Sequence, residues 1–232
     1  MSPVIQPVLK TKPIMGTYKQ GIYGPYSGRV GNVIGTFWKG RCIMRIRAAS
    51  FTDANTIPQQ IQRMKWKLVS AFVKANSKLV KLGFGAADAT LTPFNSAMKF
   101  NIPEAITGTF PTLSLDLTKA TLAIGDLAPV EGGAVTSTVP NTLAVDWADN
   151  TNNVDAFDDD DLRFAVIDSA SGEVMHFSGY SRMNETASLV VPENWASRTV
   201  SVIGFFLKAG LTEVTNRDQV SNSVHIGTAT IA

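Results

Sequence analysis

The hydrophobic pattern of this chain changes at Phe110, and that change limits the folds open to it. Beyond Phe110, short runs of alternating apolar and polar residues are separated by turn-forming residues. Eight such runs have strand length: Leu113 to Leu117, Ala120 to Ile124, Thr142 to Trp147, Leu162 to Asp168, Glu173 to Phe177, Ala187 to Val191, Thr199 to Leu207, and Ser223 to Ile231. Period-two alternation at hairpin-like spacing indicates an antiparallel β-sandwich.

Trp147 narrows the type of sandwich. It ends the run from Leu143, which is where immunoglobulin-like and fibronectin-like modules often place their core tryptophan. The chain has one cysteine, Cys42, so only the disulfide-free version of that architecture is available. Because its neighbours are apolar, Cys42 is expected to be buried or half-buried.

The segment 16–40 has a different character. It contains seven glycines with interleaved aromatic residues, a composition that favours turns and strands and predicts a hairpin-rich or extended arm. The stretch from Trp38 to Arg47 then predicts a strand with a basic face. Its basic residues are Lys39, Arg41, Arg45 and Arg47.

A helix is predicted from Ile57 to Leu82, because Thr56 can cap it and Pro58 suits its first turn. Apolar residues recur at helical spacing along one side: Ile57, Ile61, Met64, Leu68, Phe72, Ala75 and Leu79. Basic residues gather on the other side: Arg63, Lys67, Lys74, Lys78 and Lys81. A shorter helix is predicted around 93–100, limited by Pro103.

These elements together predict a mainly β fold of the α+β class. Residues 1–109 are expected to form a basic module, with a hairpin arm and a long amphipathic helix. Residues 110–232 are expected to form an acidic immunoglobulin/fibronectin-like β-sandwich.

Charge is divided unequally along the chain, although its net charge is only +2. Residues 1–104 carry 15 Lys/Arg against 3 acids, and residues 105–232 carry 6 Lys/Arg against 16 acids. Such an asymmetry indicates a basic surface able to meet nucleic acid, another copy of the chain, or both.

The segment from Gly21 to Gly40 reads GIYGPYSGRVGNVIGTFWKG. It resembles the opening signature of an uncharacterised family of bacterial and phage-associated proteins, a domain of unknown function. The predicted long helix and the segments from Asn101 to Gly108 and from Val220 to Gly227 are similar to later landmarks of that family. The resemblance covers most of the chain and implies no activity or catalytic residue.

No catalytic constellation is recognisable in the residues. The glycine-rich stretch from Gly28 to Gly35 matches neither of the two glycine-rich nucleotide-binding motifs, GxGxxG and GxxxxGK(S/T). The only histidines, His176 and His225, lie in predicted strands, which leaves little material for a Ser/His/Asp site or a histidine metal site. The chain is therefore predicted not to be an enzyme and to need no cofactor.

An acidic segment follows Trp147 and is expected to form an exposed docking loop for a basic neighbour. Its aspartates are Asp155, Asp158, Asp159, Asp160 and Asp161. Calcium binding and a simply solvated loop are the alternatives, because the oxygen ligands are present but the spacing is not that of an EF-hand.

The leading functional prediction is a non-enzymatic, self-assembling structural protein, such as a capsid or tail component of a virion. A nucleic-acid-binding protein that uses the basic helix is the alternative, and a surface adhesion module is a third. The expected partners are copies of the same chain and nucleic acid, with no membrane. Without a recognisable signal peptide or transmembrane run, the expected location is a virion or the cytoplasm.

Overall fold

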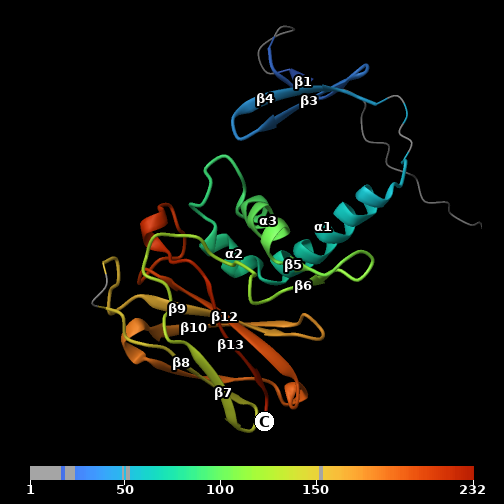
Figure 1. Cartoon of the computed structure of the whole chain (residues 1–232). Coiled ribbons are helices and arrows are strands. Elements are labelled where there is room, and N and C mark those ends of the chain that lie inside the picture. Colours follow the sequence, from blue (N-terminus) through green and yellow to red (C-terminus); the bar gives the residue numbers. More distant parts are fainter. Residues whose placement is uncertain (1–16, 19–23, 49, 51–52, 152–153) are drawn as a thin grey trace, which may run out of the picture. The chain divides into compact units, whose positions relative to one another are not determined.

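The computed structural model describes residues 17–18, 24–48, 50, 53–151 and 154–232 (Figure 1). The chain divides into two compact units, Met1–Asn55 and Thr56–Ala232. Within these residues the fold is mainly β with three α-helices, which confirms the predicted α+β class.

The N-terminal unit is an antiparallel sheet with strands in the order β1-β2-β3-β4. The strands are β1 (Thr17–Tyr18), β2 (Tyr26–Val30), β3 (Val33–Trp38) and β4 (Arg41–Ile46). Positive φ at Gly31, Lys39 and Gly40 provides the tight hairpin turns. The predicted strand from Trp38 to Arg47 is wrong at its start, because Trp38 ends β3 and Lys39 lies in the turn.

The helices of the second unit are α1 (Ile57–Ala75), α2 (Ser77–Gly83) and α3 (Pro93–Glu104). Thr56 and Gln59 form the capping box that starts α1. The single helix predicted to Leu82 is divided at Asn76, whose buried side-chain amide donates to the Phe72 carbonyl at 3.0 Å. Pro103 lies within α3, which therefore extends one turn further than predicted.

Two antiparallel sheets form the sandwich. One has the order β10-β9-β12-β13, made of β9 (Asp161–Asp168), β10 (Val174–Ser181), β12 (Thr199–Leu207) and β13 (Val224–Thr230). The other has the order β11-β8-β7, made of β7 (Ala134–Val139), β8 (Thr142–Asp146) and β11 (Thr186–Val190). A short pair, β5 (Ile106–Thr107) and β6 (Ser114–Leu115), and the 3₁₀ turns Arg182–Asn184, Glu193–Trp195 and Arg217–Gln219 complete the unit.

In the second unit one predicted strand is absent, and two observed strands, β7 and the two-residue β5, were not predicted. The run from Ala120 to Ile124 is irregular, because it packs against α2, where the Ile124 amide donates to the Gly83 carbonyl at 3.0 Å. A Cβ on Gly83 would lie 2.2 Å from the Leu122 carbonyl oxygen, so only glycine permits this approach. Strand β7 is rich in Thr and Ser and has no buried residue to mark it.

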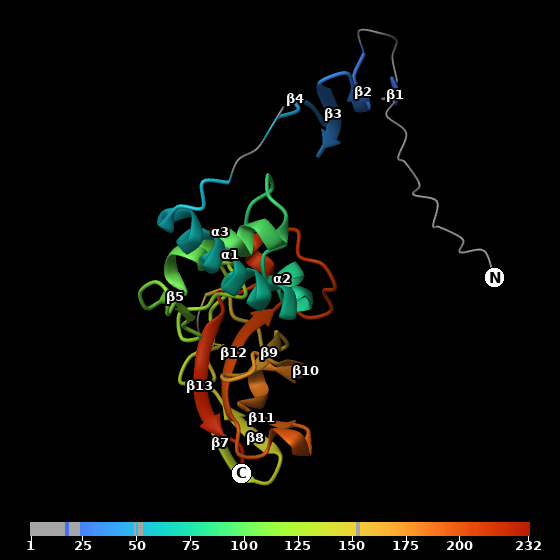
Figure 2. The same ribbon diagram turned by 90° about the vertical axis from the view of Figure 1, so that its right-hand side faces the viewer.

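Sheet β10-β9-β12-β13 is the middle of three layers, with the helices on one face and sheet β11-β8-β7 on the other (Figures 1 and 2). Along β9, Phe164 and Val166 join the core between the two sheets, while Ala165 and Ile167 join the core under the helices. In β12, Phe206 faces the sheet core and Phe205 faces the helix core. The central strands are therefore buried on both faces.

Because of these three layers, the boundary between the two units differs from the predicted one. The predicted division between 109 and 110 would separate the helices from the strands that share their core. The observed division falls between Asn55 and Thr56 instead. The physical reason is the second buried face of β9 and β12, which a two-layer sandwich of residues 110–232 would leave in water.

Candidate interaction surfaces

Strand register in the N-terminal sheet collects arginines on one face. Arg29 of β2 pairs with Ile34 of β3, and Ile34 pairs with Arg45 of β4. Trp38 pairs with Arg41 on the same ladder. Because directly paired residues project from the same face of a sheet, these side chains share one surface.

Arg47 extends this surface. Its amide donates to the Asn32 carbonyl at 2.8 Å, which continues the ladder beyond β4, and alternation puts it on the face of Arg45. We call this surface the basic face, composed of Arg29, Arg41, Arg45 and Arg47 around Trp38. The Trp38 side chain is 50% exposed. The first 55 residues contain eight Lys/Arg and one acid, Asp53, so the arginines are poorly compensated locally.

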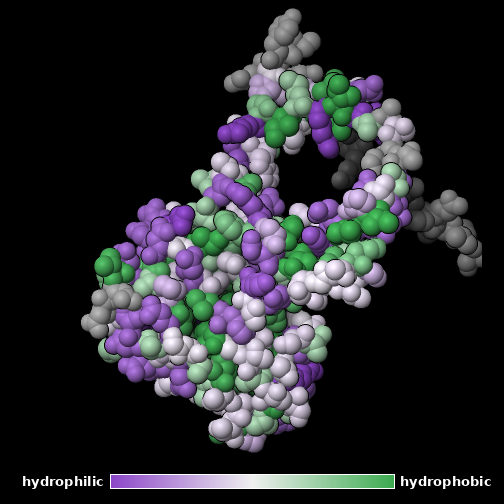
Figure 3. Space-filling view, in the orientation of Figure 1, coloured by the Kyte–Doolittle hydropathy of each residue, from purple (hydrophilic) through white to green (hydrophobic). Residues whose placement is uncertain are grey.

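The reverse of the same sheet is apolar. We call it the apolar face; its members are Val30, Val33, Phe37, Cys42, Met44 and Ile46. Met44 is 65% exposed and Ile46 is 79% exposed. Cys42 is exposed as well, so the prediction that it is buried or half-buried is wrong. The apolar neighbours that suggested burial, Ile43 and Met44, are themselves exposed. Figure 3 shows hydrophobic and hydrophilic residues together on the visible side of the N-terminal sheet.

The predicted basic helix row is present but divided. Arg63, Lys67 and Lys74 lie on α1 within about 40° of one another at 100° per residue. Lys78 and Lys81 belong to α2, beyond the break at Asn76. All five are exposed, and Lys81 pairs with Glu213 at 3.6 Å.

The predicted apolar side of α1 is only partly the buried side. Val69, Phe72 and Val73 face the core, whereas Ile57 is 63% exposed. The buried stripe is therefore rotated from the predicted one. Because α1 carries apolar residues on more than one side, the sequence pattern does not decide which side is buried. The packing of α1 against α3 and the sheet decides it.

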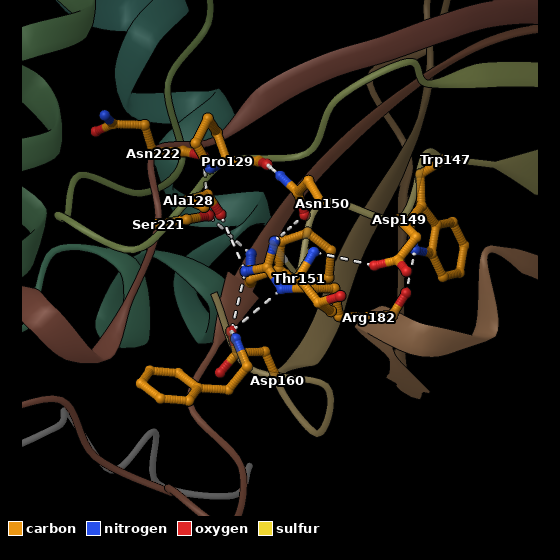
Figure 4. A network of polar contacts seen from close by, with 12 residues as sticks. Ala128, Pro129, Trp147, Asp149, Asn150, Thr151, Asp160, Arg182, Ser221 and Asn222 are labelled. Atoms are coloured by element: carbon orange, nitrogen blue, oxygen red, sulfur yellow. Dashed lines mark hydrogen bonds and ion pairs between the residues drawn. The ribbon is translucent and has the colours of Figure 1, made fainter. Parts of the chain in front are cut away.

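The prediction that Asp160 belongs to an exposed docking loop is wrong, because Asp160 is fully buried (Figure 4). Its Oδ2 accepts from Arg182 Nη2 at 2.9 Å, and Arg182 is also fully buried. The same guanidinium donates to Asn150 Oδ1 and, at 3.0 Å, to the Ala128 carbonyl. It lies 3.7 Å from the Phe206 ring centroid. This aspartate therefore holds the loop to the core and is not available to a partner.

Asp161 is also occupied. It lies in β9, pairs with Arg163, and accepts from the Gly179 amide at 3.0 Å. Asp155, Asp158 and Asp159 remain exposed. Among the residues that the structure describes, no group of three or more His, Cys, Asp or Glu is arranged to hold a metal ion, so the calcium alternative gains no support.

Trp147 and the histidines have structural contacts. Trp147 is buried, as predicted, and its indole donates to the Arg182 carbonyl at 2.9 Å. His176 contacts the Asn76 side chain at 3.2 Å, and burial, assisted by Lys78, lowers the pKa of its imidazole. His225 contacts Thr228 at 3.2 Å. The Trp147 and His176 contacts join strands to neighbouring elements, whereas the His225 contact is with the hydroxyl of a threonine on the same strand, β13.

A cleft of about 290 Å³ lies between α1, β6 and the β9–β10 turn, and the sequence contained no signal for it. Leu68, Leu115 and Ile167 contribute its apolar wall. Its carboxylate, Asp168, accepts from Ser171 at 2.7 Å and from Arg198 at 2.9 Å. The polar groups of Asp168 are therefore already satisfied by the protein.

Most of the chain is similar to one family of proteins. The model of a family of unknown function (DUF6266) matches residues 24–227. No curated protein matches the chain. One matching solved structure is the fn3 domain of the human collagen alpha-1(XX) chain, at 18% identity and a TM-score of 0.34 over 46% of this chain and 86% of that one. No helix among the described residues is long and apolar enough to cross a membrane.

Proposed function

The chain belongs to the family of unknown function DUF6266, whose model matches residues 24–227, and from its surfaces we propose that it is a non-enzymatic protein that binds single-stranded nucleic acid. The basic face is the observation that carries this proposal. It combines four arginines with an exposed tryptophan on one side of a small sheet.

The chemistry of this face suits a flexible, negatively charged strand. Guanidinium groups form paired hydrogen bonds with phosphate oxygens. An exposed indole ring offers a base a surface for stacking, which is how sequence-tolerant single-strand binders gain affinity. Neighbouring strands lie about 4.8 Å apart, so Arg29 and Arg45, on the two strands that flank β3, have backbones about 10 Å apart, and their long side chains can reach separate phosphates of one strand.

Salt dependence tests the proposal. Binding of a labelled single strand, followed by fluorescence anisotropy, should weaken steeply as salt rises, because each phosphate contact releases counterions. The double variant Arg41→Gln/Arg45→Gln should lower the magnitude of the log–log salt slope by about 1.4, since each arginine that no longer neutralises a phosphate reduces it by about 0.7.

The matched control separates the two basic surfaces. Lys67→Gln/Lys74→Gln removes the same charge from α1 and should leave the slope unchanged. If the slope falls only in this control, the nucleic acid binds to the basic residues of the helix, as the sequence suggested, and not to the basic face. A wild-type chain that does not bind a single strand at low salt would refute the proposal.

A second proposal is a self-assembling structural role, including a capsid or tail component of a bacterial virus. Two observations favour it. The N-terminal unit has eight Lys/Arg against one acid, whereas Thr56–Ala232 has 13 against 18, so unlike surfaces of two copies attract each other. The apolar face also exposes large side chains. Electron microscopy of the purified protein tests this role, and a monomer at every salt concentration by light scattering would refute it.

A further inference from the structure

We propose that the apolar face of the N-terminal sheet packs against the same face of a second copy, which makes the chain a two-fold dimer with two basic faces turned outward. This inference rests on the self-assembly proposal and names its contact surface. The nucleic-acid proposal does not depend on it.

The apolar face needs a cover. Among the described residues 24–48 the one buried residue is Gly35, which has no side chain, so this sheet buries none of its own side chains. A sheet of this size gains stability only when its hydrophobic side is packed against another layer. Met44 and Ile46 are nevertheless mostly exposed, so the layer that would bury them has to come from outside this sheet.

The charge pattern favours a second copy as that layer. No member of the apolar face carries a charge, so two such faces can meet without burying a like-charge pair. All four arginines of the basic face project from the opposite side and would lie away from the contact. The same sheet cannot dimerise through its basic face, because the guanidinium groups would repel one another.

The small size of the face sets the expected strength. Three strands of five or six residues cover about 15 Å by 20 Å, with about 10 Å between packed sheets. Interfaces this small belong to the weak class, so the dissociation constant is expected to be about 10 to 100 µM. A single strand that spans both basic faces would bind more tightly than to one face.

The test uses the full chain without nucleic acid. Sedimentation velocity should show a monomer–dimer equilibrium in the micromolar range. Met44→Lys should weaken it at least tenfold, since each copy would bring an unpaired positive charge into an apolar contact. Ile43→Lys is the matched control, because Ile43 is the neighbour of Met44 on β4 and projects from the basic face, and it should leave the equilibrium unchanged.

The reactivity of Cys42 measures independently whether the apolar face is covered, because Cys42 is the only cysteine of the chain and lies on that face. Its rate of reaction with a bulky thiol reagent should fall as wild-type concentration rises, and should stay constant in Met44→Lys. Folding of that variant is verified by its circular dichroism spectrum and its urea unfolding midpoint, which should match those of Ile43→Lys.

Three results would overturn the inference. A wild-type monomer with constant Cys42 reactivity would remove the dimer and the self-assembly proposal together. A Met44→Lys variant that assembles like wild type would place the contact on another surface and leave self-assembly standing. A monomer whose Cys42 is protected at every concentration would show that the chain covers this face itself. Loss of single-strand binding alone would affect only the nucleic-acid proposal.

Discussion

Arginine has opposite roles in the two units. In the second unit, Arg182 is fully buried and all of its contacts are with the protein. In the N-terminal sheet, Arg41 and Arg45 are exposed and aligned on one face. A charged side chain is therefore available to a partner only where the fold leaves it exposed, because a buried ion must be paired within the protein.

The two units also differ in how their apolar residues are used. The second unit buries them in two cores that share the sheet β10-β9-β12-β13. The N-terminal sheet leaves Met44 and Ile46 exposed on one face. The second unit is therefore expected to be stable on its own, whereas the N-terminal sheet is expected to depend on a partner.

The largest expected effect comes from cutting the second unit. A chain of residues 110–232 loses α1–α3 and exposes Ile167, Ile203, Phe205 and Leu207, so it should aggregate or lose cooperative unfolding. A chain of residues 56–232 keeps both cores and should unfold in one cooperative transition. Differential scanning calorimetry of both fragments checks this, and cooperative folding of 110–232 would restore the predicted boundary.

Next in size is the loss of the buried ion pair. Arg182→Met should destabilise the protein by about 3 to 5 kcal/mol, because it leaves the Asp160 carboxylate buried without its cation. Urea unfolding provides the measurement. Arg45→Met, an exposed arginine on the N-terminal sheet, is the control and should change stability by less than about 0.5 kcal/mol. Equal effects would mean that the two arginines have similar roles.

Removal of the stacking surface should have a smaller effect, and on binding alone. Trp38→Ala is expected to cost about 1 to 3 kcal/mol of single-strand affinity, a reduction of about 5- to 150-fold. Trp66, on α1, is 51% exposed and supplies the control, because Trp66→Ala removes a similarly exposed indole from the other unit. Anisotropy titrations that show equal reductions for both variants would argue against a specific role for the basic face.

The smallest effect is a pH dependence confined to the second unit. Burial lowers the pKa of both His176 and His225 in the folded state. The unfolded chain therefore binds more protons below its ordinary histidine pKa of about 6.5, and stability should fall as pH drops through that value.

His176→Gln should reduce this pH dependence, because glutamine can keep a hydrogen bond to Asn76 but does not titrate in this range. Unfolding free energies at pH 7.5 and 5.5 provide the measurement. His225 remains in that variant, so part of the dependence should persist. A slope identical to wild type would show that His176 contributes nothing to it.

Much of the local structure was predictable because its causes are local. Thr56 and Gln59 cap α1, and alternation identified β12 at its observed bounds, Thr199–Leu207. Strand β7 was missed because its polar residues obscure the pattern. The exposed arginines of β4 were found as basic residues, but Arg29 was missed, since only the strand register places it beside Ile34 and Arg45.

Neighbouring residues in the chain were sufficient to specify the starts of α1 and α3, most strands, the core position of Trp147 and the excess of positive charge before residue 105. The tertiary structure decided which charges and apolar residues are available to a partner. It buried Asp160 against Arg182, rotated the buried side of α1, and placed Cys42 and Met44 on an open face. The reason is that propensity and alternation depend on adjacent residues, whereas burial depends on layers that meet from distant parts of the chain.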